Sequence, residues 1–240
     1  MQWHPEPFQK YLLKILSQLS YLFGSLLELI YNVIGDYAIS IIVFTVVVKL
    51  LLLPLTLTQT KSMKSMQLIQ PKMDEIKKKY QNDPDKQNQK IMELYKEHKV
   101  NPLAGCLPLL IQFPIIIGLF NALREPVKYV FGTEAAYKIA DTGFLWVNNL
   151  ASPDVILLGG ISIPFILPIL AAITTYIQSA MMSPKGGKKD PTQTMMLYMF
   201  PIMMLFWGIS FPAGLLLYWV VGNIFQIVQQ YILSKPSKVT

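Results

Sequence analysis

The sequence predicts an all-α, polytopic membrane protein, and two observations lead to this fold class. Apolar residues make up 52% of the 240 residues and charged residues only 15%, with a mean hydropathy of +0.40. These values lie outside the range of soluble domains of this size. Long windows almost free of charge also recur along the chain, and each exceeds the length of an ordinary buried helix. These windows are residues 37–58, 103–123, 156–182 and 195–233.

The last window is too long to cross a bilayer only once. As a single helix it would measure about 58 Å at the α-helical rise, against a hydrocarbon core of about 30 Å. The chain has a natural turning point in the stretch FPAG at 211–214. We therefore expect five transmembrane helices, which are residues 34–58, 103–123, 156–182, 195–211 and 212–233.

Lysine and arginine residues predict the orientation of these helices, because cytoplasmic segments retain positive charge. The first, third and fifth segments outside the membrane hold 5 of these residues, whereas the second, fourth and sixth hold 15. We therefore expect the N-terminus outside and the C-terminus in the cytoplasm. The net charge of +7 mainly reflects this topology. A basic cytoplasmic face also suits anionic lipid or RNA, and nothing in the chain points to DNA.

Residues 1–33 are expected to form an amphipathic helix that lies in the outer interface. Polar and apolar side chains separate onto opposite faces at helical spacing between residues 10 and 30. The polar face consists of Lys10, Lys14, Ser17, Gln18, Gly24, Ser25 and Glu28. A sixth transmembrane helix is the alternative, and the charges on the polar face disfavour it. No small-residue cleavage site follows, so we expect no cleavable signal peptide.

Residues 59–102 are a long polar block that predicts a cytoplasmic helical hairpin. Apolar side chains recur every three or four residues on both sides of a turn at 82–85, Asn-Asp-Pro-Asp. A solvated connector between two spans is the alternative, but a connector needs only a few residues. We therefore expect the block to bind a partner through its apolar seam. The seam residues are Met63, Met66, Met73, Ile76, Tyr80 and Tyr95.

The remaining segments outside the membrane carry no recognisable binding motif. The outer loop at 124–155 has no pattern that assigns a role. The cytoplasmic loop at 183–194 begins with the basic stretch SPKGGKKDP, whose glycines lack the strand and helix of a phosphate-binding loop. Residues 234–240 are expected to form a basic cytoplasmic tail.

Catalysis is not expected. Neither His4 nor His98 lies in an expected span, and no pair of aspartates lies within the spans. The spans therefore lack the general base or the aspartate pair that hydrolysis requires. The single cysteine, Cys106, excludes an intrachain disulfide. No cluster of His, Cys and Asp has the spacing of metal ligands. We therefore expect neither an enzyme nor a bound cofactor or metal.

Lys49 lies inside the first expected span, where a charge costs about 2.5–3.5 kcal/mol on insertion scales. No Asp or Glu occurs within the five spans, so a buried ion pair is excluded. The end of the helix near Thr58 is about 14 Å away at helical rise, which is farther than the side chain reaches by snorkelling. A water-filled cavity that opens to the cytoplasm would accommodate the charge.

Other polar residues within the spans have the spacing to line such a cavity, because they fall on single faces of their helices. Hydrogen bonds between packed helices are the alternative. This alternative accounts for an isolated Gln112 but not for a lysine without a counter-ion. We therefore expect a polar groove lined by Thr45, Lys49, Thr56, Gln112, Thr174, Gln178, Trp219, Asn223 and Gln226, with Gln230 on the same face of the last helix.

Two long motifs resemble those of the YidC/Oxa/Alb membrane protein insertases. They are NPLAGCLPLLIQFPI at 101–115 and FPAGLLLYW at 211–219, accompanied by a cation five residues before Pro54. The resemblance extends from about residue 20 to 233 and is to the short bacterial form with five spans. It implies helices that enclose a hydrophilic groove open to the cytoplasm and to lipid. The family's groove cation is usually arginine, whereas this chain has Lys49, which cannot form a bidentate fork.

The resemblance implies a membrane protein insertase and chaperone in the bacterial plasma membrane. Its positive groove would draw in the translocated segment of a nascent membrane protein, and the apolar helix would leave sideways into lipid. The hairpin at 59–102 would receive the chain, Lys235, Lys238 and the loop at 183–191 would touch the ribosome, and the Sec translocon is a candidate partner. A small-anion channel or transporter, and an assembly factor that translocates nothing, stay open as other classes.

Overall fold

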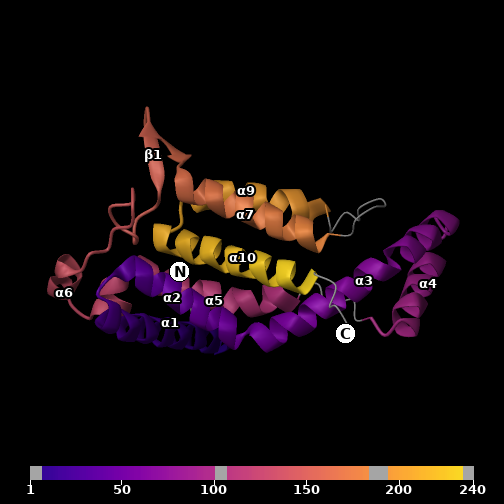
Figure 1. Cartoon of the computed structure of the whole chain (residues 1–240), viewed down its shortest axis with the longest axis horizontal. Helices are drawn as coiled ribbons and strands as arrows, with labels where there is room; N and C mark the ends of the chain where they lie inside the picture. Colours follow the sequence, from indigo (N-terminus) through magenta and orange to yellow (C-terminus); the bar gives the residue numbers. More distant parts are fainter. Residues whose placement is uncertain (1–6, 101–106, 184–193, 235–240) are drawn as a thin grey trace.

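The computed structural model describes residues 7–100, 107–183 and 194–234. This part of the chain is mostly helical, as expected, and its helices are arranged around α10 (Ala213–Ser234) (Figure 1). α10 packs against α7 (Ile166–Met182) on one side and against α2 (Tyr37–Leu51) and α5 (Leu107–Arg124) on the other. α10 therefore connects two parts of the bundle that have few contacts with each other.

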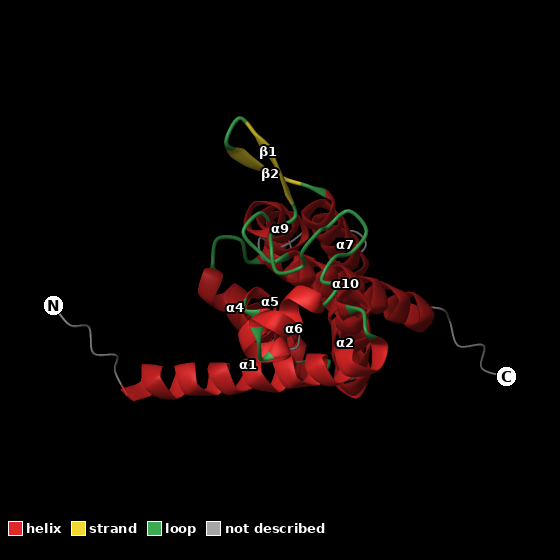
Figure 2. Ribbon diagram, turned by 90° about the vertical axis from the view of Figure 1, so that its left-hand side faces the viewer, coloured by secondary structure: helices red, strands yellow, loops and turns green. Residues whose placement is uncertain are grey.

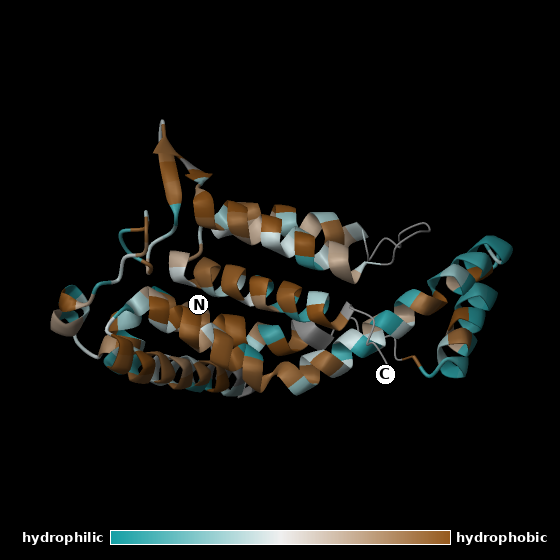
Figure 3. Ribbon diagram, in the orientation of Figure 1, coloured by the Kyte–Doolittle hydropathy of each residue, from teal (hydrophilic) through white to brown (hydrophobic). Residues whose placement is uncertain are grey.

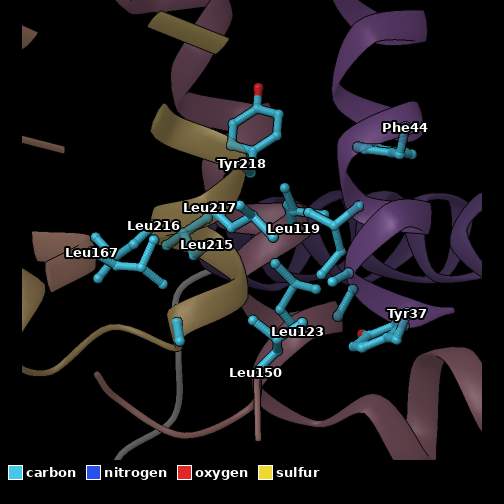
Figure 4. Packing of buried hydrophobic residues seen from close by; sticks show 14 of the residues in the cluster. Tyr37, Phe44, Leu119, Leu123, Leu150, Leu167, Leu215, Leu216, Leu217 and Tyr218 are labelled. Carbon is cyan, nitrogen blue, oxygen red and sulfur yellow. The ribbon is translucent and has the colours of Figure 1, made fainter. Parts of the chain in front are cut away.

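The core lies where α10 meets α2 and α5 (Figure 4). Its largest buried side chains are Tyr37, Phe44, Leu119, Leu123, Leu150, Leu167, Leu215, Leu216 and Tyr218. The start of α10 is fixed by the loop before β1 (Val155–Leu158), since the backbone nitrogens of Ala213 and Gly214 donate to the carbonyls of Ser152 and Leu150 at 2.8 Å each. These bonds satisfy donors that a helix N-terminus leaves without a partner.

α2 and α3 (Leu53–Lys79) form one helical run that bends by 63° around Leu52. The Asp36 carboxylate caps α2 by accepting from the backbone nitrogen of Ile39 at 2.8 Å. Pro54 explains the bend, because it has no N–H to donate and its ring crowds the preceding turn. The apolar helix that holds Lys49 therefore ends at Leu51 and not near Thr58, the end expected from the sequence.

α3 and α4 (Pro84–Glu97) form a helical hairpin that extends away from the bundle and is largely hydrophilic (Figure 3). Asp83 caps α4 by accepting from the backbone nitrogen of Lys86 at 3.1 Å, and Pro84 occupies the first helical turn, where it costs no hydrogen bond. The two helices are held together by a small core of their own, consisting of Ile69, Met73, Leu94 and Val100.

α1 (Pro7–Ile34) packs along α5, α2 and the short π-helix η2 (Val127–Phe131) and crosses the bundle obliquely (Figure 2). Leu27 of α1 is fully buried in the main core. Gly24 allows the closest approach, because a Cβ at this position would collide with the carbonyl oxygen of Tyr129. α1 is therefore a packed part of the bundle as well as an amphipathic helix.

Residues 155–164 form a β-hairpin, although the sequence places most of them in the third apolar window. β1 (Val155–Leu158) pairs antiparallel with β2 (Ile161–Pro164). Gly159 and Gly160 form the connection with φ values of +58° and +83°, as a two-residue hairpin turn with positive φ requires. An apolar run alone does not distinguish a buried helix from a strand. Because the strands occupy the start of the apolar window, the helix α7 begins later than expected, at Ile166.

α7 pairs with α9 (Phe200–Gly208), which follows the π-helix η3 (Met195–Met199). A short connection links β2 to α7. Gly208 brings the pair close, since a Cβ there would lie 3.0 Å from the Cβ of Pro168. Large apolar side chains cover the outer face of the pair (Figure 3). Such an uncovered apolar surface is typical of an interaction with lipid or another protein.

Among the described helices, α10 alone is long and apolar enough to cross a membrane by itself. α2 and α3 meet the same criteria only when the bent pair is taken as one span. α5, α7 and the η3–α9 run are shorter apolar helices. The short helix α6 (Glu134–Ile139) lies between η2 and β1 in the sequence.

The close contact at Gly24 predicts that Gly24→Ala destabilises the protein. Adding a methyl group where backbone blocks it typically costs about 1–3 kcal/mol, so the thermal unfolding temperature of the purified protein in detergent should fall. Ser25→Ala is the matched control, because Ser25 is exposed on the next position of the same helix. An equal fall for both variants would mean that the α1–η2 contact does not form.

Candidate functional site

Lys49 lies in the last turn of α2 and is only 9% exposed. Its side chain runs against α10 at Gly222, where a Cβ would lie 2.9 Å from Lys49 Cε and 3.5 Å from Nζ. No carboxylate of the described chain forms an ion pair with it. The glycine therefore provides the space that the lysine occupies, and the charge has no internal counter-ion there.

Thr45, one turn before Lys49, also faces α10. Its methyl group would lie 3.8 Å from a Cβ at Gly222, and its hydroxyl donates to the carbonyl of Ile41 at 2.6 Å. The hydroxyl is thus satisfied within its own helix. Thr45 and Lys49 share one face of α2, as their spacing predicts.

A second group of expected residues forms a hydrogen-bonded chain between α7 and α10. Trp219 Nε1 donates to Thr175 Oγ1 at 2.9 Å, and Gln178 Nε2 donates to Gln226 Oε1 at 2.6 Å. The Asn223 amide is best satisfied with its nitrogen donating to Gln178 Oε1 at 2.8 Å and its oxygen accepting from Trp219 Nε1 at 3.2 Å. Thr174 Oγ1 lies 3.0 Å from the same amide.

The other expected groove residues meet α10 on different sides. Gln112 Nε2 of α5 donates to the hydroxyl of Tyr218 at 2.9 Å. Thr56 of α3 pairs with Gln229, whose Nε2 donates to the threonine hydroxyl at 3.2 Å. The expected residues are therefore divided among several helix–helix contacts of α10.

A small pocket lies between α3, α7 and α10, toward the end of the bundle that bears the hairpin. Its lining residues are Thr60, Met63, Lys64, Gln67, Met181, Met182 and Gln230. Two of them attach α3 to helix ends: Lys64 Nζ donates to the carbonyl of Leu233 at 2.8 Å, and Gln67 Nε2 donates to that of Met182 at 2.6 Å. Both bonds satisfy carbonyls that a helix C-terminus leaves free.

The seam residues expected to bind a partner lie mostly inside the α3–α4 hairpin. Met73 is buried there, and Met66, Ile76 and Tyr95 pack against the same small core. Tyr80 lies at the turn with the Lys79 and Lys86 ammonium groups each 5.7 Å from its ring centre. Met63 is separate and lines the pocket described above. The seam therefore holds the two helices together, and the exposed apolar side chains of the hairpin are instead Leu68 (80% exposed) and Met92 (48%).

Sequence reasoning missed four residues that contact the expected groove residues: Thr175, Tyr218, Gly222 and Gln229. Thr175 and Gln229 each stand next to an expected residue in the sequence. The presence of two adjacent polar residues inside an apolar helix was the signal that could have identified them. Gly222 gives a weaker signal, which is a lone glycine in the middle of an apolar helix. Most of the expected loop at 183–194 and of the expected tail at 234–240 lies outside the described residues, namely 184–193 and 235–240.

Comparisons with known proteins agree with the resemblance noted in the motifs. Residues 29–239 match the family described as 60Kd inner membrane protein. The chain is 42% identical over 205 residues to the membrane protein insertase YidC of Fusobacterium nucleatum, covering 85% of this chain and 89% of the relative. For the insertase YidC of Caldanaerobacter subterraneus the identity is 43% over 215 residues, covering 90% and 93%. For MisCA, a membrane protein insertase of Bacillus subtilis, it is 39% over 222 residues, covering 90% and 78%.

A solved structure agrees with these matches. The chain is similar to the crystal structure of an active YidC insertase with its first transmembrane domain resolved, with a TM-score of 0.63 and 27% sequence identity. The similarity covers 91% of this chain and 46% of the solved one, so this chain spans under half of that protein. The helical bundle and the sequence motifs lead to the same assignment: the chain belongs to the 60Kd inner membrane protein family of membrane protein insertases.

Proposed function

We propose that this insertase uses Lys49 as the positive charge that draws the translocated segment of a nascent membrane protein into the bundle. The observation that carries the proposal is a nearly buried ammonium group, without an ion-pair partner in the described chain, beside a glycine of α10. A carboxylate arriving from a substrate would supply the missing counter-charge. Such a contact is worth about 1 kcal/mol in water and about 4 kcal/mol near a protein surface.

The polar contacts of α10 would form the route for the polar segment. The hydrogen bonds of Trp219, Asn223 and Gln178 join α7 to α10, and interhelical bonds of this kind contribute only about 0.6–2 kcal/mol each. A passing polar segment can replace them with bonds of its own at little net cost. The apolar helix of the substrate would then move sideways along α7 and α9 into lipid, because its burial there is favourable by about 25 cal/mol per Å².

In this proposal five spans surround the groove: the α2–α3 run up to about Thr58, α5, α7, the η3–α9 run and α10. The N-terminus is outside, and the α3–α4 hairpin stands in the cytoplasm, where its ten lysines within 59–102 suit the positive-inside rule. α1 lies at the outer interface, where it packs on the bundle through Leu27 and exposes large apolar side chains such as Leu29 and Val33. Shorter helices such as α7 would span because short hydrophobic stretches locally thin a bilayer.

The hairpin would receive the nascent chain through its exposed apolar side chains, Leu68 and Met92. The expected seam is less suited to this role, because Met73 and its neighbours already pack between α3 and α4. The small pocket with Met63 lies between the hairpin and the bundle, and its flexible thioether side chains can adapt to different apolar residues. The basic cytoplasmic segments would contact the ribosome, and the Sec translocon is a candidate partner.

Replacing Lys49 tests the proposal directly. Lys49→Ala should lower insertion of a single-span substrate with an acidic translocated tail about tenfold, since one charge contact of about 1–4 kcal/mol is lost, whereas Lys49→Arg should retain insertion. The measurement is protection of the tail from protease in liposomes that contain the purified protein. A substrate with a neutral tail is the control and should be affected much less. Equal insertion by Lys49→Ala and wild type would overturn the role of the charge.

The contact between Gly222 and Lys49 makes a second prediction. Gly222→Ala should displace the lysine side chain, because the new Cβ would lie 2.9 Å from Cε, and should lower insertion of the acidic-tail substrate about as much as Lys49→Ala. Gly214→Ala is the control: it lies on the same helix and its Cβ would contact Ile41 at 3.2 Å, remote from the lysine.

The double variant separates positioning from simple damage to the fold. In the Lys49→Ala background, Gly222→Ala should cause no further loss, since two residues that act through one contact are not additive. A further loss of the same size would mean that Gly222 acts independently of Lys49.

Replacing the exposed apolar residues of the α3–α4 hairpin should have a different effect from replacing a buried one. Leu68→Ser combined with Met92→Ser should lower crosslinking between the hairpin and a ribosome-bound nascent chain about fivefold or more, equivalent to about 1 kcal/mol of lost apolar contact. Met73→Ser should instead destabilise the hairpin by about 2–5 kcal/mol, in the range of large-to-small core changes. Hydrogen exchange of the hairpin amides separates the two effects, and faster exchange in the double surface variant would contradict the prediction.

A further inference from the structure

The β-hairpin at 155–164 carries an uncovered aliphatic face. The strand register pairs Leu158 with Ile161 and Ile156 with Ile163, and alternate residues of a strand lie on the same face. All four side chains are therefore on one face, and they are between 39% and 69% exposed. Leu157, on the other face, is 71% exposed. The hairpin contains no charged residue.

The base of the hairpin is firmly attached to α7. Asp154 is buried, and one of its carboxylate oxygens accepts from the backbone nitrogen of Leu167 at 2.7 Å and from Trp146 Nε1 at 3.2 Å. The carbonyl of Asp154 also accepts from the backbone nitrogen of Phe165 at 3.2 Å. These bonds fix the direction in which the strands leave the helix.

That direction is across the helices and away from α10. Figures 1 and 2 both show the strands projecting outward from the end of the α7–α9 pair that lies opposite the α3–α4 hairpin. Figure 3 shows that apolar residues predominate both in the strands and in the part of this pair next to them. Ile169 and Ile173 of α7 and Phe206 of α9 are 43%, 49% and 70% exposed. The strands therefore extend the uncovered apolar surface of the pair sideways.

We propose that the hairpin lies in the outer interfacial layer of the bilayer, where its aliphatic face contacts the acyl chains and anchors the α7–α9 pair. In water, an isolated two-stranded hairpin is marginally stable at best, and apolar side chains on both faces would be unfavourable. In the hydrocarbon centre, the unpaired backbone groups along the strand edges would have no partner. The interface supplies acyl chains for the side chains and water or headgroups for the strand edges.

Lipid is favoured over a protein partner because the apolar face continues the surface of α7 and α9 and offers no charge or polar group to specify a partner. The inference rests on the transmembrane spans proposed above in one respect only, which is the leaflet of the bilayer that the β-hairpin contacts. Its test does not use insertion activity, so its failure and the failure of the proposed mechanism are distinguishable.

Fluorescent labelling at Leu158 tests the placement. In a Cys106→Ser background, Leu158→Cys would carry an environment-sensitive fluorescent probe in proteoliposomes. Quenching of the probe would be measured with lipids spin-labelled near the headgroup, with lipids spin-labelled deep in the acyl chain, and with iodide in the water. Interfacial apolar faces lie about 5–10 Å into the headgroup boundary, so the shallow label should quench about twice as strongly as the deep one, and iodide should quench weakly.

Two labelled positions calibrate the result. A probe at Glu134→Cys, exposed on α6, should respond to iodide and not to lipid labels, whereas a probe at Ile173→Cys should respond to lipid labels. Strong iodide quenching at Leu158 without lipid quenching would place the hairpin in water. Protection from all three quenchers would mean that protein covers it, and stronger deep than shallow quenching would place it in the hydrocarbon. Each of these outcomes would overturn the proposal.

Discussion

The rest of the structure depends on the satisfaction of polar groups on α10 by its neighbours. In apolar surroundings no water is available, so an unpaired polar side chain is costly; several polar side chains of α10 find partners on other helices, although the buried Gln230 Oε1 has none in the described chain. Tyr218 bonds to α5, Asn223 to α7 and Gln229 to α3, while Gly222 leaves space for Lys49 of α2. Each contact is weak, but together they specify which helix lies on which side. The leucine packing between them is less directional and fills the remaining space.

These same contacts make α10 the boundary between two parts of the bundle that meet it differently. α1, α2 and α5 contribute most of the large core around α10, whereas α7 and α9 add Leu167, Ala171 and Met204 to that core and α7 also meets α10 through a polar seam of hydrogen bonds. The α7–α10 contact therefore combines directional hydrogen bonds with buried apolar packing.

The sequence was sufficient for the helical class and the insertase family, because hydropathy and two long motifs determine them. It also predicted the turn between α3 and α4, although Pro84 and Asp85 of the expected turn at 82–85 lie in the first turn of α4. Periodicity indicates which residues share a face, but not which neighbour that face meets, so pairs such as Gln112 with Tyr218 could not be predicted. Gly222 is difficult to find because a missing side chain leaves no mark in hydropathy. Residues 155–164 were read within an apolar helix since apolar runs fit both strand and helix.

The bend at Leu52 has a structural consequence. Lys49 lies one turn before the bend, and α3 leaves it as a nearly continuous rod that reaches the hairpin turn at Tyr80. The same rod is bonded through Lys64 and Gln67 to the last carbonyls of α10 and α7. The α3–α4 hairpin is therefore connected through a single helix, with Pro71 in its interior, to the turn that carries Lys49 and to the ends of the two helices beside it.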